Sequence, residues 1–416
     1  MSLTLDDPAL VLRADAQPWL DPSTYWGALT DATRDRSAPV VALSLEALSW
    51  NARDLTRRAG GLPIRVASKS VRVRAVLDAV LALPGYQGVL AYTVAEAHWL
   101  SESIDDVVVA YPSADLAALA ALGRDERAAA RVTIMVDSVE QLDLVDRAIA
   151  PGDRASIRVC LDLDSSWRAP ALGHIGVLRS PLHEPSDIRR VAERVVSRPG
   201  FTLVGIMAYE AQIAGVGDAP EGKPFDAALM GWIQRRSAAE LADRRREAVA
   251  AVRQVADLEF VNGGGTGSIE RTVSEAAVTE VAAGSGLFGP HLFDHYRSFH
   301  PAPAAAFALD VVRRPAPRAA TLLGGGWIAS GVSGADRSPL PVWPEGLTVA
   351  PREGAGEVQT PVLGRAADGL RPGDRVWFRH TKAGEIAEHT NELVPVSGGV
   401  AQDPVPSYRG EGKCFL

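Results

Sequence analysis

The sequence predicts an α/β fold, a (β/α)8 barrel of the TIM type followed by a C-terminal β-rich domain. Two observations lead to this prediction. From about residue 39, short β-branched runs alternate with amphipathic stretches, which is typical of repeated βα units. After about residue 295 the pattern changes to short apolar runs broken by Gly and Pro, which indicates a second, β-rich domain.

The elements of the barrel can be assigned in order along the chain. The eight candidate strands are 39–43, 64–68, 88–91, 107–110, 132–136, 156–161, 202–208 and 258–262. Helical patterns separate most of them, at 45–58, 71–83, 93–101, 113–122, 138–148, 186–197 and 225–255. Eight strands with intervening helices over about 250 residues match a (β/α)8 barrel. An open, doubly wound sheet is the alternative that periodicity leaves open.

Three regions follow from these assignments. Residues 1–38 carry Trp19 and Trp26 with little periodicity, and we expect this extension to pack on the domains rather than fold alone. Residues 39–294 are assigned to the barrel. Residues 295–416 form the predicted C-terminal domain, with short apolar runs at 321–326, 346–350 and 375–378.

Composition narrows the class of function. Of the 416 residues 47% are hydrophobic, and 43 basic against 51 acidic side chains give a net charge of −8, which argues against general binding to nucleic acid or to anionic lipid. The two cysteines, Cys160 and Cys414, lack metal-ligand spacing and are too few for a disulfide framework. With no export signal or long apolar run, the expectation is a cytoplasmic enzyme that acts on a small molecule.

Lys69 directly follows the apolar strand 64–68. Partial desolvation at a strand end lowers the pKa of a lysine amine toward the value that a Schiff-base nucleophile needs. The simpler interpretation is a lysine that extends from the strand end into water.

A glycine-rich loop, Asn262–Ser268, follows the last predicted strand. Consecutive glycines let backbone N–H groups converge on an anion, and Thr266 and Ser268 add hydroxyl donors. Barrels commonly bind phosphate after their seventh and eighth strands. The loop is neither a P-loop nor a dinucleotide fingerprint, and a purely structural turn is the alternative. An early lysine and a late phosphate loop together predict pyridoxal 5′-phosphate, which needs one amine and one phosphate site.

Several segments resemble the fold-type III pyridoxal-phosphate enzymes, in particular the D-threonine aldolase and D-serine dehydratase group, also called amino acid deaminase/aldolase. Residues 39–51 match the group's Pro-Val opening pattern, with Ser44 in place of an Asp. Residues 65–72 keep the group's Arg and Schiff-base Lys but lose both of its histidines. Segments 205–210, 263–268 and 279–285 resemble its Tyr-Glu strand, its phosphate loop and its Thr-Glu-x-x-x-Gly-Ser segment.

The resemblance implies a set of cofactor contacts. His174 takes the position of an Arg that related enzymes place near the pyridine nitrogen, and Tyr209 packs against the cofactor. The complete set is Lys69, Arg65, Tyr209, Gly264, Gly265, Thr266, Gly267, Ser285, Gly286 and His174.

The sequence departs from this group in the C-terminal domain. There, the group has a His-x-Cys or His-x-Asp pair that binds a divalent metal, whereas this chain has His380 and Lys382. His380 is the only matching ligand position, and a protonated lysine cannot coordinate metal. The hypothesis is that the metal is lost, that Lys382 supplies a fixed positive charge near the β-oxygen or carboxylate of the substrate, and that His380 takes part in proton transfer. Both residues can equally be ordinary solvated strand residues.

The resemblance implies a lyase that acts on a β-hydroxy D-amino acid. Retro-aldol cleavage gives glycine and an aldehyde, and is placed slightly ahead of β-elimination, which gives a keto acid and ammonia. A racemase of the alanine racemase type, a non-catalytic pyridoxal-phosphate-binding protein and a barrel for another phosphate ester are the alternatives. The resemblance also implies a homodimer.

Overall fold

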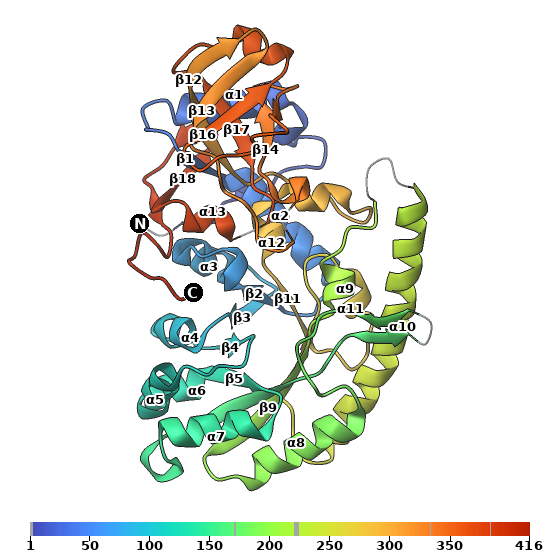
Figure 1. The fold of residues 1–416 in the computed structure, drawn as a ribbon. Helices are drawn as coiled ribbons and strands as arrows, with labels where there is room; N and C mark the ends of the chain where they lie inside the picture. The colour runs from blue at the N-terminus through green and yellow to red at the C-terminus, as the bar shows by residue number, and fades with distance from the viewer. Residues whose placement is uncertain (1–2, 170–171, 220–223, 333, 383) are drawn as a thin grey trace.

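The computed structural model describes residues 3–169, 172–219, 224–332, 334–382 and 384–416 (Figure 1). Eight parallel strands close into a barrel in the order β10-β11-β2-β3-β4-β5-β6-β9. They are β2 (Ile64–Ala67), β3 (Tyr86–Ala91), β4 (Val107–Val109), β5 (Val132–Val136), β6 (Ile157–Asp162), β9 (Phe201–Ala208), β10 (Phe260–Gly263) and β11 (Glu280–Ala283). The predicted closed barrel is confirmed, and an open doubly wound sheet is excluded.

The prediction for the first strand was wrong. Strand β1 (Val40–Ser44) lies outside the barrel, where it pairs antiparallel with β12 (Ala305–Ala316) and parallel with β18 (Glu392–Ser397). Strand β11, which was not predicted as a strand, completes the barrel by pairing with β10 and β2. All five residues of β1 are buried, and an apolar run of this kind does not reveal which sheet it enters.

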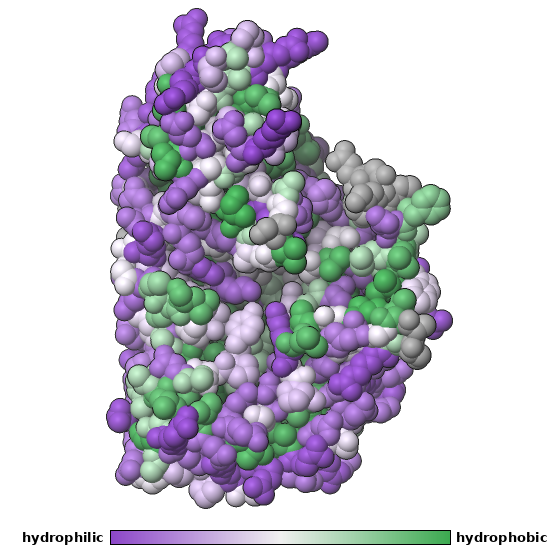
Figure 2. Space-filling model, viewed as in Figure 1, coloured by the Kyte–Doolittle hydropathy of each residue, from purple (hydrophilic) through white to green (hydrophobic). Residues whose placement is uncertain are grey.

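Helices and short turns connect the barrel strands. The helices of the barrel region are α2 (Leu45–Arg58), α3 (Arg74–Leu81), α4 (Val94–Leu100), α5 (Leu116–Arg124), α6 (Glu126–Arg131), α7 (Val139–Ala148), α8 (Pro185–Ser197), α9 (Ala211–Ala214), α10 (Pro224–Arg253), α11 (Ile269–Thr272) and α12 (Ser285–Phe288). A small hairpin of β7 (Trp167–Ala169) and β8 (Gly173–Ile175) follows β6. Figure 2 shows apolar side chains gathered over the start of α10, where Phe225, Leu229 and Trp232 are exposed.

The second domain is the predicted β-rich unit, drawn above the barrel in Figure 1. Its sheet runs β15-β16-β13-β12-β1-β18-β19, with β17 beside β12 and β14, and β20 beside β18. The remaining elements are β13 (Ala319–Leu323), β14 (Leu340–Trp343), β15 (Thr348–Val349), β16 (Gln359–Leu363), β17 (Arg375–Arg379), α13 (Glu385–Glu388), β19 (Val400–Ala401) and β20 (Val405–Pro406).

The N-terminal extension packs on this second sheet. Its helix α1 (Pro22–Ala32) is preceded by the N-cap residue Asp21, whose carboxylate accepts the backbone N–H groups of Ser23 and Thr24. Tyr25 and Trp26 of α1 are buried, and they form one hydrophobic cluster with Trp377 of β17. Burial of these large rings ties the extension to the second domain.

The interior of the barrel is filled by side chains rather than open. Eight buried residues from seven of the strands form this inner cluster: Leu90, Val108, Met135, Cys160, Val204, Met207, Phe260 and Ala282. Because side chains fill the lower part of the barrel, we expect the active site at the carboxyl ends of the strands, as in other (β/α)8 barrels. Within the described residues, no helix is long and apolar enough to span a membrane.

Candidate active site

A cavity of about 1220 Å³ lies between the carboxyl ends of the barrel strands and the second domain. Barrel residues such as Ala67, Ala110 and Tyr209 line one part of it, and Ser330 and Lys382 line the other. Pockets for drug-sized ligands measure about 300–1,000 Å³. The space is therefore sufficient for a cofactor together with a small substrate.

Lys69 enters this cavity from a short 3-10 turn, Ser68–Ser70, directly after β2. The hydroxyl of Ser68 donates to the carbonyl of Leu90 at 3.1 Å, which ties the turn to the end of β3. Arg72 donates through Nε to the carbonyl of Lys69 at 3.0 Å. A Cβ atom on Gly384 of the second domain would lie 2.3 Å from that same carbonyl. The second domain thus approaches the Lys69 backbone so closely that position 384 has no room for a side chain.

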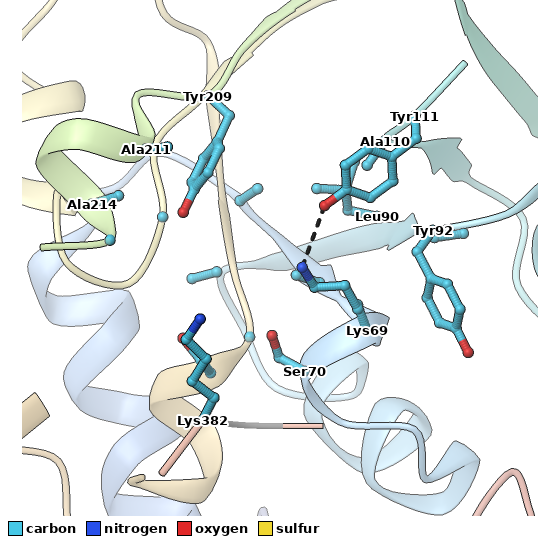
Figure 3. A pocket seen from close by; sticks show the side chains of 18 of the residues that line it. Lys69, Ser70, Leu90, Tyr92, Ala110, Tyr111, Tyr209, Ala211, Ala214 and Lys382 are labelled. Atoms are coloured by element: carbon cyan, nitrogen blue, oxygen red, sulfur yellow. Dashed lines mark hydrogen bonds between the residues drawn. The ribbon is translucent and has the colours of Figure 1, made fainter. Parts of the chain in front are cut away.

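Three side chains face Lys69 within the cavity (Figure 3). The Nζ atom of Lys69 lies 3.3 Å from the hydroxyl of Tyr111. Tyr209 points into the cavity from the end of β9, and Lys382 points toward it from the second domain. Burial raises the pKa of Tyr209 to about 12, so that this phenol stays protonated at neutral pH.

The glycine loop lies across the cavity, where Gly264, Gly265, Thr266 and Ser285 contribute to its lining. Gly264 has φ of +80°, which favours glycine, and a Cβ atom on Gly265 would lie 2.9 Å from the ring of Tyr209. The N–H of Gly286 and the hydroxyl of Ser285 both donate to Oγ1 of Thr266 at 3.1 Å. The loop after β10 and the start of α12 therefore form one unit.

Buried charges hold this unit in place from behind. The carboxylate of Glu210 accepts the N–H of Gly264 at 3.1 Å, the hydroxyl of Ser268 at 3.2 Å and the guanidinium of Arg245 at 3.1 Å. Arg58 donates to the carbonyl of Thr266 at 2.6 Å. Both Glu210 and Arg58 are buried, so these contacts fix the loop in its shape.

These residues fit pyridoxal 5′-phosphate. Among the described residues, the backbone N–H groups of Thr266 and Ser285 make no hydrogen bond to the protein, although both residues line the cavity. Free N–H groups at a glycine turn and at the start of a helix are donors for a phosphate. Lys69 supplies the amine in the same cavity. Gly267 and Gly286 lie outside the lining, and a Cβ atom on either would approach a neighbour within 3 Å.

The predicted cofactor contact of Arg65 does not agree with its position. Its side chain is 2% exposed and lies inside the barrel. There it forms two hydrogen bonds with Glu280, at 2.8 and 2.9 Å, and an ion pair with Asp106. Arg65 lies outside the cavity lining, so its role is to close the barrel between β2, β11 and the start of β4.

His174 is likewise not at the cavity. It lies exposed on strand β8 and is absent from the lining, whereas Arg179, five residues further on, contributes to it. The guanidinium carbon of Arg179 lies 5.3 Å from the ring centre of Tyr209 and 5.5 Å from that of Tyr111. Arg179, rather than His174, is therefore the residue of this segment whose side chain reaches the cavity.

The divalent metal implied by the resemblance does not fit the second-domain residues. The ring of His380 is buried against Phe288, neither of its nitrogens has a hydrogen-bond partner among the described residues, and burial lowers its pKa to about 3. Lys382 donates through Nζ to the carbonyl of Ser330 at 2.9 Å. Among the described residues, no three His, Cys, Asp or Glu side chains are grouped as metal ligands. Because His380 lies outside the cavity lining, its predicted role in proton transfer is not supported either.

Sequence reasoning missed two residues that the cavity brings together with Lys69 and Lys382, namely Tyr111 and Arg179. It named Glu385 only as one of three nearby carboxylates, with Glu353 and Glu357, and Glu385 is the one that lines the cavity. Tyr111 follows β4 by two residues, so its position after a barrel strand was a usable signal. Arg179 lies in an irregular segment, where no periodicity gives the direction of a side chain.

Comparison with known proteins places the chain in a family. Residues 43–291, more than half of the chain, match the alanine racemase N-terminal domain. The chain therefore belongs to this family, whose members are pyridoxal-phosphate enzymes. The result confirms the superfamily that the sequence resembles.

Individual relatives are more distant. The chain is 29% identical over 257 residues to a 3-hydroxy-D-aspartate aldolase of Paracoccus denitrificans, covering 60% of each chain. It is 26% identical over 240 residues to a D-threonine aldolase of Arthrobacter sp, covering 56% of each. The matched region thus spans less than two thirds of these curated relatives.

Two solved structures share the fold over most of their length. One is D-threonine aldolase from Filomicrobium marinum, with a TM-score of 0.74, 20% identity, and coverage of 90% of this chain and 96% of that one. The other is D-threo-3-hydroxyaspartate dehydratase from Delftia sp. HT23, with a TM-score of 0.70, 16% identity, and coverage of 89% and 97%. At these identities the likeness establishes the two-domain fold.

Proposed function

We propose that this protein is a pyridoxal-phosphate-dependent lyase that cleaves a β-hydroxy D-amino acid, with retro-aldol cleavage to glycine and an aldehyde as the main reaction. The observation that carries the proposal is the position of Lys69, which shares one cavity with the glycine loop Gly264–Thr266. The relatives named above, aldolases of D-threonine and of 3-hydroxy-D-aspartate, support the substrate class.

Each part of the cavity has a role in this proposal. The loop and the start of α12 bind the phosphate, and Lys69 supplies the amine that holds the aldehyde carbon. When bound, the cofactor provides an electron sink for a bond broken at the α-carbon of the substrate. Tyr111, beside Nζ of Lys69, is placed to receive or return a proton at that nitrogen.

The other cavity residues orient the substrate and exclude water. The guanidinium of Arg179 lies over the ring of Tyr209. From there it can donate hydrogen bonds to an anionic group of the substrate or to the ring nitrogen of the cofactor. Tyr209 limits the space next to the loop, and the second domain covers the barrel mouth through Lys382 and Ser330. Holding one substrate bond in the reactive orientation decides which bond breaks. We also propose that the protein is a homodimer, as the resemblance implies, which light scattering of the purified protein can test.

The first experiment tests the covalent site. The holoprotein is expected to be yellow, and borohydride reduction followed by peptide mass spectrometry is expected to label Lys69. Lys69→Ala removes the label and the activity, whereas Lys413→Ala, at a half-buried lysine beside Trp99 and outside the cavity lining, keeps both. A colourless protein after reconstitution, or full activity of Lys69→Ala, contradicts the proposal.

The second experiment identifies the reaction. The holoprotein is incubated with D-threonine, D-serine, 3-hydroxy-D-aspartate and D-alanine, and glycine, ammonia and the L-isomers are assayed separately. Glycine as the main product supports retro-aldol cleavage. Ammonia with a keto acid indicates β-elimination instead, and L-alanine as the only product indicates a racemase. A yellow protein with no product from any amino acid indicates a non-catalytic cofactor-binding protein.

A further inference from the structure

Two cationic side chains of the second domain converge beside the cavity. The hypothetical Cβ position of Gly331 lies 3.6 Å from Nζ of Lys382 and 3.5 Å from Nε of Arg337. Gly331 has φ of +123°, a conformation that favours glycine, so no side chain fills the space between the two cations. Lys382 itself lines the cavity.

These cations have unused hydrogen-bond donors. Lys382 donates to the carbonyl of Ser330, and a lysine ammonium has three donors. The Nε and Nη1 atoms of Arg337 are buried without a hydrogen-bond partner among the described residues. The carboxylate nearest to Arg337 is Asp336, 3.5 Å from Nη2 and largely exposed. Buried donors of a charged group are costly when they stay unpaired.

The neighbouring acid does not neutralise the pair. Glu385 accepts the N–H and the hydroxyl of Ser330 through Oε1, each at 3.1 Å. In the described part of the chain, no ion pair within 4 Å joins Glu385 to Lys382 or to Arg337. Burial, together with the positive charges of Arg337 and Lys69, lowers the pKa of Lys382, while the charges of Glu385 and Asp336 act in the opposite direction. The two cations are therefore only partly neutralised, because Asp336 pairs with Arg337 from an exposed position and Lys382 has no ion-pair partner within 4 Å among the described residues.

The cavity lining carries charges of both signs. The charged side chains of the described lining are the cations Lys69, Arg72, Arg179 and Lys382 and the carboxylates Asp115 and Glu385, and Arg72 is paired with Glu388. The phosphate loop belongs to the barrel, whereas Lys382 faces Lys69 from the second domain (Figure 3). A phosphate in the loop therefore leaves the unused donors of Lys382 available to a second anion.

We propose that Lys382, supported by Arg337 beside it just outside the cavity lining, binds a carboxylate at the far end of the substrate side chain. The preferred substrate is then a β-hydroxy D-amino acid with a second carboxylate. The two cations bind that carboxylate without a metal. The inference rests on the proposed function. A neutral β-hydroxyl needs one hydrogen bond, whereas two converging cations with free donors match the charge of a carboxylate.

The test compares two probes that differ by one carboxylate. Binding of D-malate and of D-lactate to the holoprotein is measured by titration calorimetry, without turnover, and metal content is measured by elemental analysis. The parent is expected to bind D-malate about tenfold to a hundredfold more tightly than D-lactate. Lys382→Met is expected to lose this difference with its cofactor absorbance unchanged. Lys382→Arg, which keeps the charge, and Lys413→Met, at a lysine outside the cavity, are expected to keep it.

Three outcomes overturn the inference. Equal binding of D-malate and D-lactate by the parent shows that no second carboxylate is recognised. If Lys382→Met then weakens the binding of both acids, Lys382 and Arg337 bind the α-carboxylate instead. A difference that survives in Lys382→Met assigns recognition to other residues. Stoichiometric Zn or Mn, with D-malate preference lost to a chelator, assigns it to a metal. Binding and metal content are both measured without cleavage of a substrate. Failure of the proposed lyase reaction is therefore distinguishable, because the holoprotein would then bind D-malate but form no product from any amino acid.

Discussion

The amine of Lys69 and the phenol of Tyr111 lie 3.3 Å apart in a cavity to which two domains contribute. One group comes from the turn after β2 and the other from the segment after β4. An amine that must gain and lose protons needs a partner at this distance. The pair therefore links the covalent site to proton transfer.

Tyr111→Phe tests that link. The variant is expected to bind the cofactor as the parent does, because the hydrogen bond of Tyr111 in the described structure goes to Lys69 and not to the glycine loop. Its kcat is expected to fall about tenfold to a hundredfold, since a positioned proton-transfer group contributes at least that much. Tyr92→Phe, which changes another tyrosine of the same lining, is the control. Unchanged kcat in Tyr111→Phe removes Tyr111 from proton handling.

Arg179 and His174 give a matched pair of variants. Arg179→Ala removes a guanidinium from the cavity lining, and kcat/KM is expected to fall about a hundredfold, as for the loss of a charged contact to a bound ligand. His174→Ala alters an exposed residue of β8 and is expected to leave kcat/KM within about twofold of the parent. Steady-state kinetics measure both. The reverse pattern restores the sequence-based assignment of His174.

Glu210→Gln is expected to loosen the phosphate loop. The substitution removes the buried charge that pairs with Arg245 and accepts the N–H of Gly264. Breaking a buried pair costs about 3 kcal/mol of unfolding free energy, and cofactor affinity should fall with it. Glu275→Gln is the control, because Glu275 also pairs with Arg245 but does not bond to the loop. Equal cofactor affinity in the two variants contradicts a specific role of Glu210.

Glu96 makes stability depend on pH. Its side chain is buried, accepts the N–H of Tyr92 at 2.7 Å and the hydroxyl of Tyr408 at 2.9 Å, and burial raises its pKa to about 7. The folded protein therefore binds this proton more tightly than the unfolded chain does. Its contribution to stability is complete below about pH 4.5 and is lost as the pH rises through about 7.

Glu96→Gln should remove this dependence. Urea unfolding at pH 5 and pH 8 is expected to show that the parent loses on the order of 3 kcal/mol more than the variant over this interval. Glu102→Gln, at an exposed position just after α4, should behave like the parent. A variant with the same pH slope as the parent places the titration elsewhere.

Much of this architecture could be predicted from the sequence because each βα unit carries its own local pattern. Seven of the eight predicted strands lie in the barrel, and Lys69 and the glycine loop lie at its open end. Strand β1 could not be assigned in this way, since its partners Ala308 and Val394 lie far along the chain and apolar runs do not specify partners.

The position of Arg65 could have been predicted more closely. Ile64 and Val66 are buried in the cluster that packs against the helices, and strand side chains alternate between faces. Arg65 therefore points into the barrel, one layer below Ala67 and the cavity. Its partner Glu280 lies on β11, which was not predicted as a strand, so the ion pair was hidden. The resemblance singled out Arg65 as part of a motif, but it did not show how deep inside the barrel this side chain lies.

The placement of β1 between β12 and β18 has a consequence for biosynthesis. The strand leaves the ribosome early but must remain unpaired until the whole barrel and then β12 have been translated. Residues 295–416 expressed alone would lack their central strand and expose two open sheet edges, which invite aggregation. Supplying a peptide of residues 22–44 during refolding of that fragment should rescue its solubility.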